Sequence, residues 1–199
     1  MGNMDFDTLR YYLRARMFEW LRRYDQAERE YRVALQHGPR SVKVVSALGY
    51  LLARRDRYEE ALGYFEEAVR LAPKNAHLLF DLGFVREKLR RIEPAIEAFQ
   101  AAVRLNPKLD RAWYGMGMCY ATLGRHEEAV SAFQQAAELQ PMNPHAWYAL
   151  GMAYHHTRNP DKVKEVVHHL FRFDPIMTRQ LIRDAQRADL AHLVKDLKV

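Results

Sequence analysis

Several features common in other protein classes are scarce in this 199-residue chain. Cys119 is its only cysteine, which excludes an intramolecular disulfide and a cluster of cysteines around a metal. The longest nearly apolar run, residues 44–53, is interrupted by Ser46 and Gly49 and is too short to cross a bilayer. Residues 1–7 have neither a basic region nor an apolar core, so we expect no secretory signal there. These absences favour a cytoplasmic protein without a membrane span.

The composition predicts a folded chain whose main partner is not a nucleic acid. Hydrophobic residues make up 49% of the chain and charged residues 28%, which is ordinary for a globular protein and unlike a disordered one. The formal net charge is +6, but the basic residues are spread along the chain. Nucleic-acid-binding proteins usually gather such charge on one face. We therefore expect nucleic acid to be an unlikely partner.

The prolines and glycines, although few, recur with a fixed period of 34 residues. Five of the 8 prolines follow this step: Pro39, Pro73, Pro107, Pro141 and Pro175. Four glycines repeat at the same step, with an alanine in the first copy: Ala15, Gly49, Gly83, Gly117 and Gly151. An alanine also recurs four positions before an aromatic residue, with two valines in the fifth copy: Ala27/Tyr31, Ala61/Phe65, Ala95/Phe99, Ala129/Phe133 and Val163/Val167. Such a period indicates a repeat protein.

Two segments carry the motif that identifies the repeat. Trp147, Leu150, Gly151 and Tyr154 spell W-x₂-L-G-x₂-Y, and Trp113, Met116, Gly117 and Tyr120 spell nearly the same pattern 34 residues earlier. This pattern resembles the tetratricopeptide repeat (TPR) family. The resemblance implies an all-α fold, a right-handed α-solenoid of five helix–turn–helix repeats plus a C-terminal capping helix. We expect a single domain over residues 1–199, with repeats at 8–41, 42–75, 76–109, 110–143 and 144–177 and a capping helix at 178–199.

The repeat pattern also predicts how the helices pack. Eleven helices are expected, in pairs near 8–39, 42–73, 76–107, 110–141 and 144–175, with the last near 176–197. Glycine or alanine in each first helix lets the second helix approach closely. Large residues such as Phe65, Phe99 and Phe133 then fill the space beside them. Proline ends each second helix because it has no N–H to donate.

No group of residues predicts catalysis or a bound cofactor. Cys119 lies within a repeated first helix and is most simply a small buried hydrophobe. His155/His156 and His168/His169, with His145 nearby, invite a metal-site interpretation, and His156 and His168 could converge. No carboxylate or cysteine completes a recognisable ligand set for them. We therefore predict a protein that is not an enzyme and that has no cofactor and no metal.

The resemblance implies a partner-binding groove on the concave side, lined by the first helix of every repeat. One subfamily clamps a C-terminal carboxylate with lysines and asparagines, and this chain has Tyr50, Phe84 and Met118 where those asparagines would be expected. What remains is an aromatic and methionine-containing groove with basic residues at its rim, although some rings could instead pack between first helices. The predicted groove residues are Tyr12, Arg16, Lys43, Tyr50, His77, Phe80, Phe84, Arg111, Tyr114, Met118, His145, Tyr148 and Met152.

A second candidate surface lies on the first helix. Leu9, Leu13, Met17 and Trp20 form an apolar row at helical spacing, and no repeat precedes them to cover it. Such a row usually marks an interaction site. It predicts either a homodimer through residues 6–20 or a docking site for another protein. The alternative is that Phe6 and the N-terminus fold back over the row.

These features together favour a non-enzymatic protein–protein interaction module: an adaptor, scaffold or assembly factor that binds an apolar or aromatic-containing peptide segment in the groove. A secretion-type chaperone for a hydrophobic client segment is the alternative, and a nucleic-acid-associated protein is less favoured.

Overall fold

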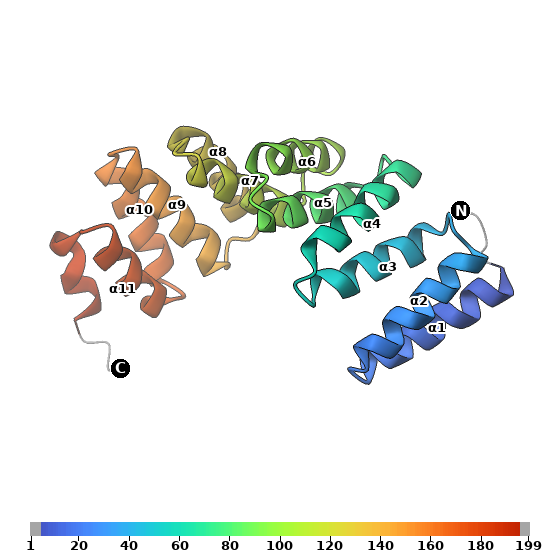
Figure 1. Cartoon of the computed structure of the whole chain (residues 1–199). Helices are drawn as coiled ribbons and strands as arrows, with labels where there is room; N and C mark the ends of the chain where they lie inside the picture. Colours follow the sequence, from blue (N-terminus) through green and yellow to red (C-terminus); the bar gives the residue numbers. More distant parts are fainter. Residues whose placement is uncertain (1–4, 196–199) are drawn as a thin grey trace. The chain divides into compact units, whose positions relative to one another are not determined.

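The computed structural model describes residues 5–195, and every regular element in that range is a helix (Figure 1). Eleven α-helices are followed by one 3₁₀ helix. In chain order they are α1 (Phe6–Trp20), α2 (Tyr24–His37), α3 (Val42–Ala53), α4 (Tyr58–Leu71), α5 (Ala76–Lys88), α6 (Ile92–Leu105), α7 (Asp110–Thr122), α8 (His126–Leu139), α9 (Pro144–His156), α10 (Pro160–Phe171), α11 (Pro175–Asp184) and η1 (Ala188–Val194). The predicted all-α fold and the five helix pairs are confirmed.

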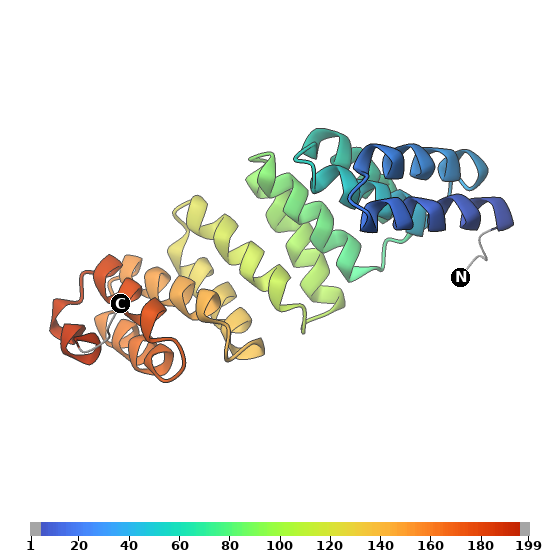
Figure 2. The same ribbon diagram turned by 90° about the horizontal axis from the view of Figure 1, so that it is seen from below.

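The helices form two compact units, one up to Leu105 and the other from Asn106. In the first unit α1 packs on α2, α3 on α4 and α5 on α6, and α2 and α4 also contact the helix that follows each of them. Figure 2 shows α1 and α2, in blue, side by side along their length. In the second unit α8 packs on both α7 and α9, and α9 contacts α10 and α11. The single domain expected over residues 1–199 stays a prediction.

Short sequence signals set the ends of the helices. Asn75 and Asn143 each cap a first helix by accepting a hydrogen bond from the backbone N–H two residues later, at 3.0 Å in both cases. The turn between the two helices of every repeat contains one residue with a positive φ, again at a step of 34: Arg22, Asp56, Arg90, Gly124 and Arg158. Only one of these is glycine, so four repeats hold an ordinary side chain in the left-handed region.

The repeated glycines lie where two helices touch. A Cβ atom built on Gly83 would lie 2.7 Å from the ring of Phe99, and one on Gly117 would lie 2.6 Å from the ring of Phe133. Both rings are almost completely buried. Only a glycine leaves room for a ring this close to the backbone, so the predicted packing of first against second helix is confirmed in these repeats.

The end of the chain differs from the single capping helix predicted for residues 178–199. α11 ends at Asp184, Gln186 adopts a positive φ of 55°, and a short 3₁₀ helix follows; residues 196–199 lie outside the described range. The left-handed residue stops α11 and turns the chain back, so the cap consists of two short elements. α11 also completes the fifth repeat, because Leu181 packs against Gly151, where an added Cβ would lie 2.7 Å away.

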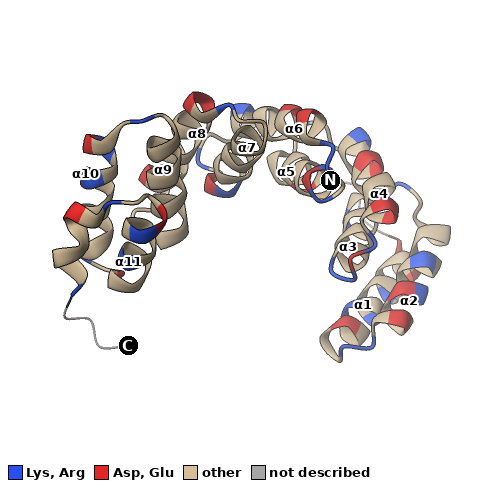
Figure 3. Cartoon of the chain, turned by 60° about the vertical axis from the view of Figure 1, so that its left-hand side comes forward, with Lys and Arg blue, Asp and Glu red and all other residues tan. Residues whose placement is uncertain are grey.

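Arginines at the turns of one repeat pair with carboxylates of the repeat before it. Arg55 binds Asp25 at 2.8 Å, Arg57 binds Glu28 at 2.6 Å and Arg91 binds Glu59 at 3.0 Å. Figure 3 shows basic and acidic positions interspersed along the helices. Burial alone would raise the pKa of Glu28, but Arg57 and Arg32 hold it below its ordinary value. These ion pairs bridge neighbouring repeats of the first unit.

Candidate functional site

The first helices of the N-terminal unit lie next to one another. Arg54, at the end of α3, donates a hydrogen bond to Glu19 of α1 at 3.1 Å. Tyr50, also on α3, donates its hydroxyl hydrogen to the carboxylate of Asp81 on α5. These contacts join α1, α3 and α5 into one surface, which we call the first-helix surface of the N-terminal unit.

Two large side chains on this surface remain open to solvent. Tyr50 is 44% exposed, and its ring meets Phe65 edge-on at 5.2 Å between centroids. Phe84 is 37% exposed, and the ammonium group of Lys88 lies 5.1 Å from its ring centroid. Each ring therefore has a contact within the protein and keeps part of its surface exposed to solvent. A cation beside an aromatic face is an attractive contact.

The basic residues predicted for this rim are exposed as expected. Arg16, Lys43 and His77 all lie at the surface. Arg16 is 3.4 Å from Glu19, whose carboxylate also receives the hydrogen bond from Arg54. The amino group of Lys88 adds a further cation, which was not among the predicted groove residues. Lys88 is four residues after Phe84 on the same helical face, and this spacing could have predicted it.

Phe80 is the clearest correction to the predicted groove. It is 7% exposed and packs against Phe99 with 5.8 Å between ring centroids, so it belongs to the core of its repeat. Tyr12 makes the equivalent contact with Tyr31 at 6.0 Å and is half-buried. In these two repeats the ring turns inward onto the large residue of the second helix, which is the alternative that the sequence left open.

The C-terminal unit has its own first-helix residues on α7 and α9. Met118 is 42% exposed, and Arg111 and His145 also lie at the surface. Tyr114 is half-buried against Phe133, at 5.6 Å, and burial raises the pKa of its hydroxyl.

α11 covers part of the C-terminal unit. Tyr148 of α9 donates a hydrogen bond to Asp184 of α11 at 2.8 Å. Burial and this carboxylate both raise the pKa of Tyr148. Met152 is also half-buried. Tyr148, which was predicted to line the groove, therefore contributes to the contact between α9 and α11.

Several histidines of the C-terminal unit lie against other rings. His156 lies over His126 with 4.6 Å between centroids, and His169 lies 3.9 Å from Trp147. Burial, followed by the neighbouring His126 and His155, lowers the pKa of His156. Across residues 5–195, no three His, Cys, Asp or Glu side chains gather closely enough to ligate a metal ion.

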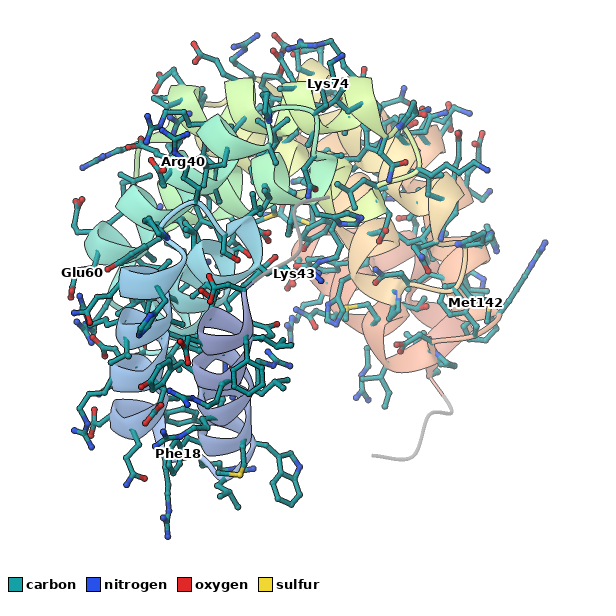
Figure 4. All side chains as sticks on the ribbon, turned by 90° about the vertical axis from the view of Figure 1, so that its right-hand side faces the viewer. Phe18, Arg40, Lys43, Glu60, Lys74 and Met142 are labelled. Carbon is teal, nitrogen blue, oxygen red and sulfur yellow. The ribbon has the colours of Figure 1, made fainter. Side chains whose placement is uncertain are left out.

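The apolar row on α1 is exposed within the described part of the chain. Leu9 and Met17 lie at the surface, Leu13 is 55% exposed and Trp20 is 82% exposed. Phe6 is the first residue of α1 and is itself exposed, so it does not fold back over the row. The opposite side of the helix faces α2, with Phe18 near the C-terminal end of α1 (Figure 4). None of the helices between residues 5 and 195 combines the length and apolar character needed to span a membrane.

Comparisons with known proteins agree with this architecture. Three family models described as tetratricopeptide repeat match residues 12–76, 48–112 and 110–143. A comparison with curated protein sequences gives no significant match.

Among solved structures, the chain is similar to YrrB, described as a TPR protein with an unusual peptide-binding site. The identity is 28% and the TM-score 0.77, over 91% of this chain and 92% of that one. It is also similar to MamA, at 22% identity and a TM-score of 0.77 over 97% of both chains. A MamA structure from Desulfovibrio magneticus RS-1 gives 22% identity and 0.74, over 92% of this chain and 98% of that one. The likeness to MamA shows the fold alone.

Proposed function

Because the chain belongs to the tetratricopeptide repeat family, we propose that it is a non-enzymatic protein-interaction module, acting as an adaptor, scaffold or assembly factor. It binds a peptide segment with bulky apolar or aromatic side chains on the first-helix surface of the N-terminal unit. The cytoplasmic location expected from the sequence is part of this proposal. Cys119, the single cysteine of the sequence, is buried, and a chain without disulfides is compatible with a reducing compartment.

The observation that carries the proposal is the exposure of Tyr50 and Phe84 on neighbouring first helices. Their homologous position in repeat four holds Met118, which is exposed to a similar degree. Aromatic and methionine side chains are enriched where protein interfaces bury their core, and a few such anchors supply most of the binding energy. Three repeats in succession therefore present an anchor at the same position.

The basic groups beside the anchors refine the expected ligand. Lys88 lies over Phe84, and Arg16 and Lys43 are exposed on the neighbouring first helices. Asp81 is buried and already accepts the hydrogen bond from Tyr50. A ligand segment that carries Asp or Glu near its apolar anchors would complement this surface. The peptide-binding site in the printed description of YrrB, which shares 28% identity, supports the same class of function.

Selection of random peptides displayed on phage tests the proposal without knowledge of the natural partner. We expect the wild-type chain to enrich peptides with bulky apolar residues next to Asp or Glu. Phe84→Ala and Tyr50→Ala should each weaken binding of such a peptide about tenfold, equivalent to about 1.4 kcal/mol. Fluorescence anisotropy measures the affinities, and circular dichroism checks that the variants fold.

Leu105→Ala is the matched control, because Leu105 is a large side chain of similar exposure on the second helix α6. It should leave the affinity unchanged. Equal affinities for the wild type, Phe84→Ala and Tyr50→Ala would show that the ligand binds elsewhere.

A further inference from the structure

The apolar row on α1 occupies a position that is buried in later repeats of the same chain. Leu13 and Met17 correspond, 34 residues later, to Ala47 and Leu51 of α3. Both are buried, in one cluster with Ala15 and Tyr31 of the first repeat. The preceding repeat therefore covers this face of α3, and α2 supplies the helix that packs along it. The same face of α1 carries larger apolar side chains and has no covering element among the described residues.

The third and fifth repeats show the same arrangement. Val85 of α5 and Ala153 of α9 correspond to Met17, and both are buried. α4 packs on α5 and α8 packs on α9. Within this fold, the element that fits the face of a first helix is therefore another α-helix. Together with the exposed Phe6, seven residues before Leu13 on the same side of the helix, the row extends over about 21 Å at 1.5 Å per residue. A helix of about four turns would cover it.

The edges of the row carry positive charge. On a helix, Arg10 and Arg16 are each three residues from Leu13 and flank it on opposite sides. Both side chains are about half-exposed, and Arg10 pairs with the equally exposed Asp7 at 3.1 Å. Glu19, the nearest carboxylate to Arg16, is largely buried and also binds Arg54 and Tyr31. Residues 8–41 as a whole contain eight arginines and only four Asp or Glu residues. A partner with carboxylates along its edges is complementary to this charge.

The same charges disfavour a second copy of the chain as the occupant. In a two-fold contact between α1 helices, each residue meets the same surface of the other copy. Arg10 would lie on the same edge as its own counterpart, and so would Arg16, so the contact would gather four arginines. Against them the two α1 helices would bring only two exposed carboxylates, the two copies of Asp7, each already paired with Arg10. Like charges placed together in this way oppose association.

We propose that the exposed face of α1 is a docking site for an amphipathic α-helix of another protein. The docked helix is about four turns long, has bulky apolar side chains along its inner face, and carries Asp or Glu along both edges. It takes the position that the second helix of a preceding repeat occupies in the later repeats. This site uses another face of α1 than the first-helix surface, with which it shares Arg16 at its edge, and it does not rest on the function proposed for that surface.

Two synthetic peptide helices test the proposal with the full-length chain. Both have about 18 residues and the same stripe of leucines; one has glutamates along its edges and the other has lysines at those positions. Fluorescence anisotropy of the labelled peptides should show the glutamate peptide binding at least about tenfold more tightly. Leu13→Glu should weaken its binding by about tenfold or more. The double variant Arg10→Glu/Arg16→Glu should reverse the preference toward the lysine peptide. That reversal would not result from loss of folding.

Leu105→Glu serves as the control, since it places the same charge at an exposed leucine on α6 and should leave binding unchanged. Equal binding of the two peptides, or full binding by a folded Leu13→Glu variant, would overturn the proposal. A wild-type dimer in light scattering at micromolar concentration that Leu13→Glu dissociates would also overturn it, and would assign the face to a contact between copies. Phe84→Ala should not change binding of the glutamate peptide, which separates this test from that of the first-helix surface.

Discussion

Gly83 and Gly63 show how the surroundings of a residue decide the role of a glycine. Gly83 of α5 lies against the ring of Phe99, and a Cβ there would be only 2.7 Å from it. Gly63 lies within α4, and nothing lies within 4 Å of a Cβ built on it. The first glycine makes a close helix contact possible, whereas the second only leaves the helix backbone more freedom in the unfolded chain.

The two glycines should therefore respond to the same substitution with opposite signs. Gly83→Ala should lower the free energy of unfolding by about 1–3 kcal/mol, because the methyl group displaces a buried ring. Gly63→Ala should raise it by about 0.5–1 kcal/mol through helix propensity. Urea denaturation followed by circular dichroism measures both. If Gly83→Ala were as stable as the wild type, the close contact with Phe99 would not be a feature of the protein.

The sequence separates these glycines because Gly83 follows the 34-residue period and Gly63 does not. The same period places Phe80 and Phe84 on one helix and predicts a surface role for both, and this was wrong for Phe80. The two rings are four residues apart and share a face, so periodicity cannot tell that one turns inward onto Phe99. The left-handed residues in the turns were also not predicted, because arginine and aspartate occupy most of them.

At the level of helices, α11 is part of the fifth repeat. In repeats two to four, the repeated glycine lies against a phenylalanine of its own repeat. In the fifth repeat the corresponding residue is the smaller Val167, and Gly151 instead contacts Leu181 of α11 and Val166 of α10. The sequence indicated a cap over the last repeat, but it did not show that the cap ends in two short elements, since the stop depends on the backbone conformation of Gln186.

Substitution of Leu181 measures the contribution of α11. Leu181 is completely buried, so Leu181→Ala should lower the free energy of unfolding by about 2–5 kcal/mol. Ile176→Ala is the control in the same helix, because Ile176 is largely exposed and should contribute less than about 1 kcal/mol. Guanidinium denaturation compares the two. Similar losses would contradict the packing of α11 against Gly151.

The contact between α8 and α9 predicts a dependence of stability on pH. Burial, His126 and His155 lower the pKa of His156 in the folded protein. In the unfolded chain this histidine has its ordinary pKa near 6.5, so it binds a proton there first as the pH falls. The folded state should therefore lose stability as the pH falls from 7 to 5. The carboxylates whose pKa is lowered, such as Glu28, lose their contribution only at lower pH.

His156→Gln tests this prediction. The urea midpoint of the wild type should fall between pH 7 and pH 5, and the fall should be smaller in the variant because one histidine that resists protonation has been removed. A fall of the same size in both proteins would show that the lowered pKa of His156 does not contribute to the pH dependence of stability.

For the whole molecule, the repeat architecture follows from a few residues that recur every 34 positions. That period predicted the five helix pairs and the packing of glycine against phenylalanine. It also predicted exposed residues at positions 50, 84 and 118, because these positions project from the first helices. It could not identify a partner, since the repeats specify a scaffold while the residues at the surface vary between repeats. The central claim is therefore that Tyr50 and Phe84 contact another protein.

Site-specific photo-cross-linking tests that claim most directly. Benzoylphenylalanine replaces Phe84 or Leu105 in the chain expressed in its native host, and the cells are then irradiated. We predict that position 84 captures a protein that position 105 does not. An excess of the wild-type chain should prevent this capture by competition, and an excess of the Tyr50→Ala variant should prevent it much less. Capture from position 105 without capture from position 84 would contradict the account.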